Sequence, residues 1–246
     1  MSAPGERYAF DEWLTALWVE SLDAASDGAA YTLGMPPEVE VAFAARLLED
    51  AGRLLAPYSH AEAAMLWHLV SDSGAMHALL APAVSWRARE RCVRAFVPLY
   101  EQVFLPGCSP HLSHLDKPGA DPLNLTCYMW WDLMAFWGPA NAEGARWNVL
   151  FLDVMEATLG MPSDPCRESA IQGLGHMPHA RGRAEAILST FLAGASGLRS
   201  ALAAYAVQRR MAACHSPRPG GSVEGSVRPA GSAVEEVVWT CTVLPS

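Results

Sequence analysis

The segment 162–192 constrains the fold more than any other part of the chain, because it predicts two consecutive amphipathic helices joined by a tight turn. Ser163 or Asp164 can accept hydrogen bonds from the first N–H groups of a helix, and Pro165 suits the first turn because it has no N–H to leave unsatisfied. Pro178 ends this helix. Apolar residues recur at helical spacing on one face of each helix: Ala170, Ile171, Leu174 and Met177, then Ala184, Ile187, Leu188, Phe191, Leu192 and Ala195. Each helix has one apolar stripe, so the pair needs further helices stacked against it.

This segment resembles a HEAT repeat, in the form found in the HEAT-like repeats of phycobilin-lyase-type proteins. The positions that carry the likeness are Arg167, Glu168, Ala170, Leu174 and Gly175. The likeness covers about one repeat, at about 162–194, and the rest of the chain only in outline. It implies an α-solenoid of stacked helical hairpins and usually a protein-binding role, whereas a minority of such proteins bind cofactors or nucleic acid. The motif is structural, so the resemblance implies no catalytic residue.

The rest of the chain has the same helical rhythm up to residue 214. Helical periodicity and capping signals predict further helices at about 8–23, 38–56, 59–70, 74–81, 87–105, 122–137, 142–159 and 197–214, the fifth of them kinked at Pro98. No strand-like alternation of useful length occurs before residue 234. The sequence therefore predicts one all-α domain at 1–214.

The C-terminal segment 215–246 has a different composition. Residues 216–233 are mostly Pro, Gly and Ser, which cannot bury enough apolar surface to offset their ordering entropy. A short, apolar and β-prone end follows at 235–246. We expect a flexible tail whose last residues are either a disordered end or a short motif that docks on a partner or on the body of the chain.

Composition and charge limit the function classes. The chain is 51% hydrophobic and 17% charged, and 26 acidic against 17 basic residues give a formal net charge of −9. This acidic balance argues against nucleic-acid binding, which needs clustered positive charge. No apolar run reaches the roughly 18 residues of a membrane span. The N-terminus is polar and acidic and shows no transport signal. The six cysteines are scattered and include no CxxC pair, so we expect a cytoplasmic protein with free thiols.

The helix predicted at 123–137 is apolar around nearly its whole circumference, except for one charge at Asp132. A lone buried carboxylate is costly, so Asp132 is either a structural anchor, met by an arginine or by N–H donors, or a pocket residue with a raised pKa. Trp130, Trp131 and Trp137 cannot all point inward from such positions. We therefore expect at least one of them to face a groove, where a tryptophan is a strong binding anchor.

Three histidine-containing groups have a functional and a structural interpretation. Cys108, His111, His114 and Asp116 include zinc-ligand types, but a second cysteine pair is missing, so a capping loop is favoured and no metal site is predicted. His68, Asp72 and His77 could form a histidine base oriented by Asp72, or ordinary helix-end contacts. His176 and His179 follow the helix that starts at Pro165, where histidines suit free carbonyl groups.

The sequence thus predicts a non-enzymatic protein-interaction module without a cofactor. The expected partner-binding residues are Trp130, Trp131, Asp132, Trp137, Arg183 and Glu185, the last two being polar positions of a helix at 182–194. The acidic surroundings favour a basic or neutral partner. The alternative is a lyase- or hydrolase-like enzyme, or a small-molecule binder, with a pocket beside Trp131 and Asp132. A binder dedicated to one protein, as immunity proteins are, is a third possibility.

Overall fold

In the computed structural model, the described residues all belong to one compact unit within residues 1–215. The structure describes residues 9–23, 35–65, 74–132, 142–177, 179–194 and 197–215. These ranges contain helices and connecting turns but no β-strand, so the predicted all-α class is confirmed for them. The predicted flexible tail lies outside the described residues.

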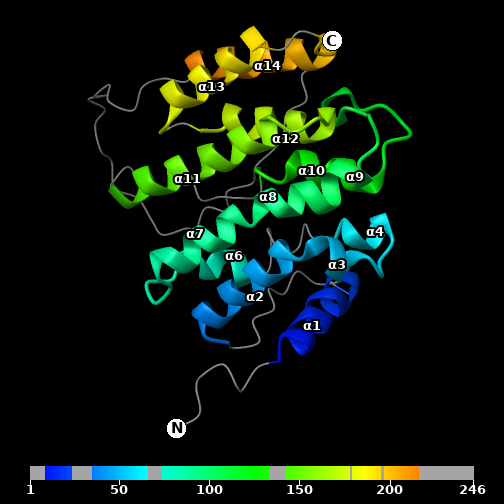
Figure 1. Ribbon diagram of the computed structural model, residues 1–246, viewed down its shortest axis with the longest axis vertical. Helices are drawn as coiled ribbons and strands as arrows, with labels where there is room; N and C mark the ends of the chain where they lie inside the picture. The colour runs from blue at the N-terminus through cyan, green and yellow to red at the C-terminus, as the bar shows by residue number, and fades with distance from the viewer. Residues whose placement is uncertain are drawn as a thin grey trace, which may run out of the picture. The chain divides into compact units, whose positions relative to one another are not determined.

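Most helices lie where the periodicity predicts them, but some predicted helices are shorter or divided (Figure 1). The helix predicted at 122–137 ends at Met129, and Trp130, Trp131 and Asp132 lie in the turn that follows it. The helices are α1 (Phe10–Asp23), α2 (Pro37–Glu49), α3 (Ala51–Leu55), α4 (His60–Ala63), α6 (Gly74–Ala78), α7 (Trp86–Arg94), α8 (Phe96–Leu99), α9 (Leu105–Gly107), α10 (Pro122–Met129), α11 (Ala142–Leu159), α12 (Asp164–Gly175), α13 (Arg181–Gly194) and α14 (Ser200–His215). A π-helical turn at Tyr100–Phe104 and a 3₁₀ turn at Ser113–Leu115 complete the set.

Side-chain caps explain the starts of α4, α7 and α10. The predicted capping box is present, since Ser59 accepts from the Glu62 N–H and the Glu62 side chain accepts from the Ser59 N–H. Pro165 does lie in the first turn of α12, but Ser163 makes no side-chain cap there. Asp164 makes an ion pair with Arg199 at 3.2 Å instead of acting as the predicted cap.

The predicted long helix at 87–105 is divided more strongly than a simple kink. α7 ends at Arg94, α8 spans only Phe96–Leu99, and the π-helical turn follows. Pro98 has no N–H to donate to the carbonyl of Arg94, and its ring crowds that carbonyl. The interruption therefore begins four residues before the proline, and the π turn follows α8 directly.

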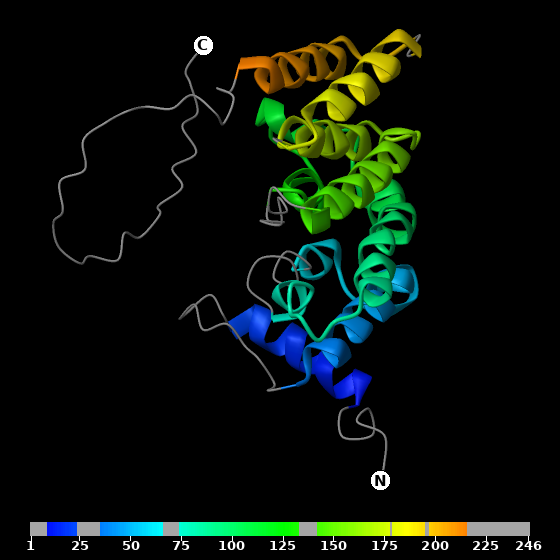
Figure 2. The same cartoon turned by 90° about the vertical axis from the view of Figure 1, so that its left-hand side faces the viewer.

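Helices of this unit pack mainly on those close to them in the chain. α2 packs on α6 and α7, α7 on α11, α11 on α12, and α12 on α13 and α14, as Figure 1 and the rotated view in Figure 2 show. α10 also packs on α12. α12 therefore has neighbours on most of its circumference, which places it at the centre of this end of the unit.

Trp130 and Trp131 are both fully buried, so neither faces a groove; Trp137, the third tryptophan of that expectation, lies outside the described residues. The Trp130 ring lies 5.3 Å from the ring of Phe96, while the Trp131 ring stacks on Tyr100 at 6.4 Å. Both indoles fit because α12 carries Gly173 opposite Trp131: a Cβ atom there would lie 2.6 Å from Trp131 Cγ. A missing side chain on a neighbouring helix thus makes room that the tryptophan helix alone does not predict.

Candidate functional site

A row of polar side chains crosses the otherwise apolar interior around α12. Glu168, Gln172 and His176 occupy every fourth position of this helix, so they share one face. Asp132 comes from the turn after α10 and Tyr205 from α14. We call these five residues the polar seam.

Asp132 is held by hydrogen-bond donors. The Gln172 amide nitrogen donates to its two carboxylate oxygens, Oδ1 at 3.0 Å and Oδ2 at 2.8 Å. His176 Nε2 lies 3.1 Å from Oδ1, and the Asp132 side chain is only 20% exposed. The carboxylate therefore has the surroundings of a structural anchor, with a glutamine and a histidine as partners.

The Gln172 carbonyl oxygen extends the seam toward α14. It accepts from the hydroxyl groups of Tyr205 and Tyr128, the latter at 3.4 Å. Arg209 Nε donates to the Tyr205 hydroxyl oxygen at 3.0 Å. Burial raises the pKa of Tyr205, so its hydroxyl keeps its proton and remains a donor to Gln172.

Glu168 is the most deeply buried member of the seam, with no exposed surface. Its carboxylate accepts from the backbone N–H groups of Ser113 and His114, both at 2.9 Å, and contacts His114 Nδ1. The His114 ring in turn stacks on Tyr205 at 4.2 Å. Glu168 therefore fixes the 3₁₀ turn to α12, a role that its position near a helix start does not predict.

These contacts also bear on the zinc-ligand types near residue 110. His114 is engaged by Glu168, and His111 Nδ1 lies 2.9 Å from the Ser109 hydroxyl oxygen. Within the described ranges, no group of three or more His, Cys, Asp and Glu side chains has an arrangement that could hold a metal ion. The loop has the contacts of a structural capping segment.

His176 is the one member of the seam with a large exposed fraction, 40% of its side chain. Burial of the rest of the ring lowers its pKa, Asp132 opposes this shift, and the positive charge of Arg209 adds to it. The imidazole is therefore neutral at pH 7. The seam supplies an acid–base pair in Asp132 and His176, but none of its five residues is a serine, threonine or cysteine nucleophile.

The remaining predicted residues lie apart from the seam. Arg183 is half exposed and makes an ion pair with Asp153 of α11 at 2.7 Å. Glu185 is half buried on α13. Trp137, together with His68 and Asp72, lies outside the described residues.

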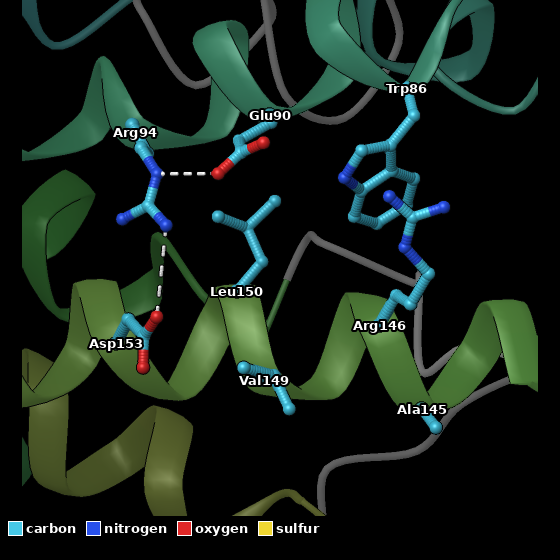
Figure 3. A pocket seen from close by; sticks show the side chains of 8 residues that line it. All are labelled: Trp86, Glu90, Arg94, Ala145, Arg146, Val149, Leu150 and Asp153. Carbon is cyan, nitrogen blue, oxygen red and sulfur yellow. Dashed lines mark hydrogen bonds and ion pairs between the residues drawn. The ribbon is translucent and has the colours of Figure 1, made fainter.

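A groove between α7 and α11, which the sequence analysis did not identify, has a volume of about 350 Å³ (Figure 3). We call it the α7–α11 groove; its lining residues are Trp86, Glu90, Arg94, Ala145, Arg146, Val149, Leu150 and Asp153. Leu150 points from α11 toward α7, and the Arg146 guanidinium lies 4.0 Å from the centroid of the Trp86 ring. At the other end, Arg94 donates to Glu90 at 3.0 Å and lies 3.8 Å from Asp153.

The sequence contains a weak signal for the seam and none for the groove. The seam could have been suspected from three polar residues at a spacing of four, which place them on one face of a helix. The groove has no such signal, because α7 and α11 are far apart in the chain and only packing brings Trp86 and Arg146 together.

No helix within the described ranges is both long and apolar enough to span a membrane. In comparisons with models of protein families, with curated proteins and with solved structures, the chain matches none of them.

Proposed function

We propose that this protein is a non-enzymatic protein-interaction module, built from stacked HEAT-like helical hairpins, which binds a partner protein through the α7–α11 groove. The stacking part of the proposal is supported by the packing order, in which α11, α12, α13 and α14 contact their neighbours in the chain. The resemblance of 162–194 to a HEAT repeat points the same way.

The observation that carries the proposal is the arrangement of Trp86. The Arg146 guanidinium lies 4.0 Å from the centroid of its ring and the Trp147 ring lies 5.0 Å from it, so its position is set before any partner arrives. A preorganised aromatic side chain loses little conformational entropy on binding, and tryptophan and arginine are the residue types most often responsible for interface affinity. Trp86 thus takes the anchor role that the buried Trp130 and Trp131 cannot fill.

The charges of the α7–α11 groove favour a specific kind of partner segment. Arg94 is already engaged by Glu90 and Asp153, whereas the interaction of Arg146 within the described ranges is with the Trp86 ring. We infer that a partner places an apolar side chain against Trp86 and Leu150 and a carboxylate on Arg146. The net charge of −9 favours a basic or neutral partner overall, so this carboxylate is a local feature of the segment.

One observation favours the alternative of an enzyme or small-molecule binder at Asp132. A second titratable group, His176, lies 3.1 Å from this carboxylate and is partly exposed. Such a pair could bind or release a proton at the edge of a ligand site. Because the seam has no serine, threonine or cysteine nucleophile and Asp132 is held by Gln172, we place this function second.

The test is quantitative affinity capture from a lysate of the source cells, with the wild-type chain and two charge-reversal variants as bait. Arg146→Glu reverses the charge in the groove, while Arg87→Glu makes the same change at an exposed position of α7 that does not line it. We expect one near-stoichiometric protein that wild type and Arg87→Glu retain and Arg146→Glu loses. Equal capture by all three baits, or none above background, would contradict the groove, and ligand screening with a His176→Ala variant would then test the alternative.

A further inference from the structure

A pocket of about 450 Å³ lies between the segment 110–117, the first residue of α12 and the residue that precedes α14. Small-molecule sites in proteins have volumes of about 300–1,000 Å³, so this pocket is large enough for a small ligand. Its lining includes three aliphatic and three charged side chains: Pro110, Leu112, Leu115, Lys117, Asp164 and Arg199. We call it the Lys117–Arg199 pocket, and none of its lining residues belongs to the polar seam or to the α7–α11 groove.

Arg199 is fixed at the wall of this pocket by one of its nitrogen atoms. Nη1 donates to the carbonyl oxygen of Pro110 and to Asp164 Oδ2, the latter at 3.2 Å. Among the residues that the structure describes, the guanidinium makes both of its interactions through Nη1, so the edge formed by Nε and Nη2 remains available. That edge presents two parallel N–H groups, the geometry that binds the two oxygens of a carboxylate. Because the side chain is already held, it loses little conformational freedom when an anion binds.

Lys117 provides a second positive charge at the same pocket. It is the only lysine of the chain, and it is exposed. Its side chain has no ion pair or hydrogen bond with any other residue of the described ranges. The preceding residue, Asp116, does not line the pocket and ends the 3₁₀ turn in a left-handed conformation. Within this part of the chain, the Lys117 ammonium group is thus a cation that a ligand can pair.

The charges that line the pocket favour a small anion. Lys117 and Arg199 contribute two positive charges and Asp164 contributes one negative charge, while the lining imidazole of His111 is counted as neutral. Arg167 does not line the pocket but lies 3.8 Å from Asp164 Oδ1, so it adds to the positive potential. The lining thus has one positive charge in excess, in a chain whose formal net charge is −9. A carboxylate balances this excess, whereas a doubly charged phosphate would leave a negative charge close to Asp164.

The rest of the lining is suited to an aliphatic group. Leu112 is buried and Leu115 is half-buried, and both belong to the hydrophobic core or pack against it, so their positions are fixed. Pro110 adds a third aliphatic ring or chain to this side of the pocket. A ligand with an apolar body removes this surface from water, which favours binding. One ligand can therefore use the charged and the apolar parts of the lining together.

We propose that the Lys117–Arg199 pocket binds a small aliphatic carboxylate, whose two oxygens lie against the Nε–Nη2 edge of Arg199 and near the Lys117 ammonium group. This inference is independent of the α7–α11 groove and of its partner protein. The structural alternative is that Arg199 only joins the start of α14 to Pro110 and Asp164. That alternative requires Nη1 alone and gives Lys117 no role, so a Lys117 variant distinguishes the two interpretations.

The first experiment measures binding of octanoate to the full chain by isothermal titration calorimetry at low ionic strength. Acetate has the same charged group without the apolar body, and octanol has the apolar body without the charge. We expect one-to-one binding of octanoate, with acetate and octanol each binding about tenfold more weakly or less. Added salt should weaken the binding of octanoate but not that of octanol, because salt screens the attraction between exposed charges.

A second measurement reports on Lys117 directly, because this residue is the only side-chain amine of the chain. Acetic anhydride acetylates exposed amines, and peptide mapping by mass spectrometry gives the rate of modification at Lys117. Octanoate at a saturating concentration should slow this acetylation. Octanol at the same concentration should leave the rate unchanged, since it has no charge to pair with the ammonium group.

Two variants remove the cations one at a time. Lys117→Gln and Arg199→Gln should each weaken octanoate binding by about tenfold or more. Lys117→Gln should melt as the wild type does, whereas Arg199→Gln also loses the contacts with Pro110 and Asp164, so circular dichroism checks that it is folded. Arg87→Gln is the matched control, because it removes the same charge from an exposed position of α7 outside the pocket, and it should bind octanoate as the wild type does.

Four results would overturn the proposal. The first two are no saturable binding of octanoate at millimolar concentrations, and equal binding by the wild type and Lys117→Gln, since either shows that the two cations do not form a carboxylate site. The third is that octanol binds as tightly as octanoate, which leaves only apolar contact. The fourth is that octyl phosphate binds more tightly than octanoate, which contradicts the charge balance of the lining and assigns the pocket to a phosphate.

Discussion

The Gln172 side-chain amide donates to both carboxylate oxygens of Asp132, at 3.0 Å and 2.8 Å, and thereby joins α12 to the turn that follows α10. The same glutamine accepts from Tyr205 of α14 through its carbonyl oxygen. One side chain thus connects three helical elements with its donor and its acceptor both satisfied. Buried polar groups cost stability unless they are paired in this way, so the seam should respond strongly to loss of any one member.

Asp132→Asn should lower the free energy of unfolding by about 1–3 kcal/mol, because the new amide group places N–H donors opposite those of Gln172. Urea unfolding of the two proteins measures the difference. Asp116→Asn is the control, since Asp116 is exposed and has a φ of 48°, a left-handed conformation that asparagine tolerates. If both variants unfold at the same urea concentration as the wild type, Asp132 is not a structural anchor.

Glu168→Gln should be more destabilising, by about 3 kcal/mol or more, because the carboxylate is fully buried and accepts from two backbone N–H groups. A glutamine can offer only one oxygen to these donors. Thermal unfolding followed by circular dichroism measures the loss. Glu156→Gln, at an exposed site of α11, should melt as the wild type does, and a similar result for Glu168→Gln would contradict the burial argument.

Gly173→Ala should destabilise the protein by about 1–3 kcal/mol, although alanine is the better helix former. The added Cβ would lie 2.6 Å from Trp131 Cγ and 2.8 Å from Met155 Cε, so both side chains must shift. At Gly175 the nearest atom is Cδ of the flexible Arg209 side chain, at 2.9 Å, so Gly175→Ala should cost less.

Gly182, which lies on α13, is the matched control for this series, because an added Cβ would have no neighbouring atom within 4 Å. Gly182→Ala should leave the melting temperature unchanged or raise it slightly. A melting temperature of Gly173→Ala at or above that of Gly182→Ala would show that α12 does not approach Trp131 this closely.

Acid should destabilise the protein through His176. Its pKa is lowered in the folded state by burial and by Arg209, against the opposing effect of Asp132, so the unfolded chain binds this proton more readily. The stabilising contribution is therefore complete above the unfolded pKa of about 6.5 and is lost as the pH falls through the folded value. The difference in unfolding free energy between the wild type and His176→Gln should shift in favour of the variant between pH 7.5 and pH 5. A difference that does not change with pH would exclude a shifted His176.

The positions of the helices could be predicted because their signals are local. Apolar residues at helical spacing, the Ser59–Glu62 capping box and the proline in the first turn of α12 act over a few residues of chain. The sequence also indicated that Asp132 is either a structural anchor or a pocket residue, because a charge within an apolar segment must find a partner. Its partners, Gln172 and His176, could not be named because they lie on another helix.

The sequence by itself determined that the described part of the chain is helical, roughly where its helices lie, and that Asp132 needs a partner, because hydrogen-bond periodicity and capping depend on near neighbours. Only the tertiary structure decided that Trp130 and Trp131 are both buried and that Trp86 meets Arg146. These outcomes depend on which faces of which helices meet. A contact such as that between Trp131 and Gly173 stabilises the fold only after both helices are placed, so no pattern within either helix encodes it.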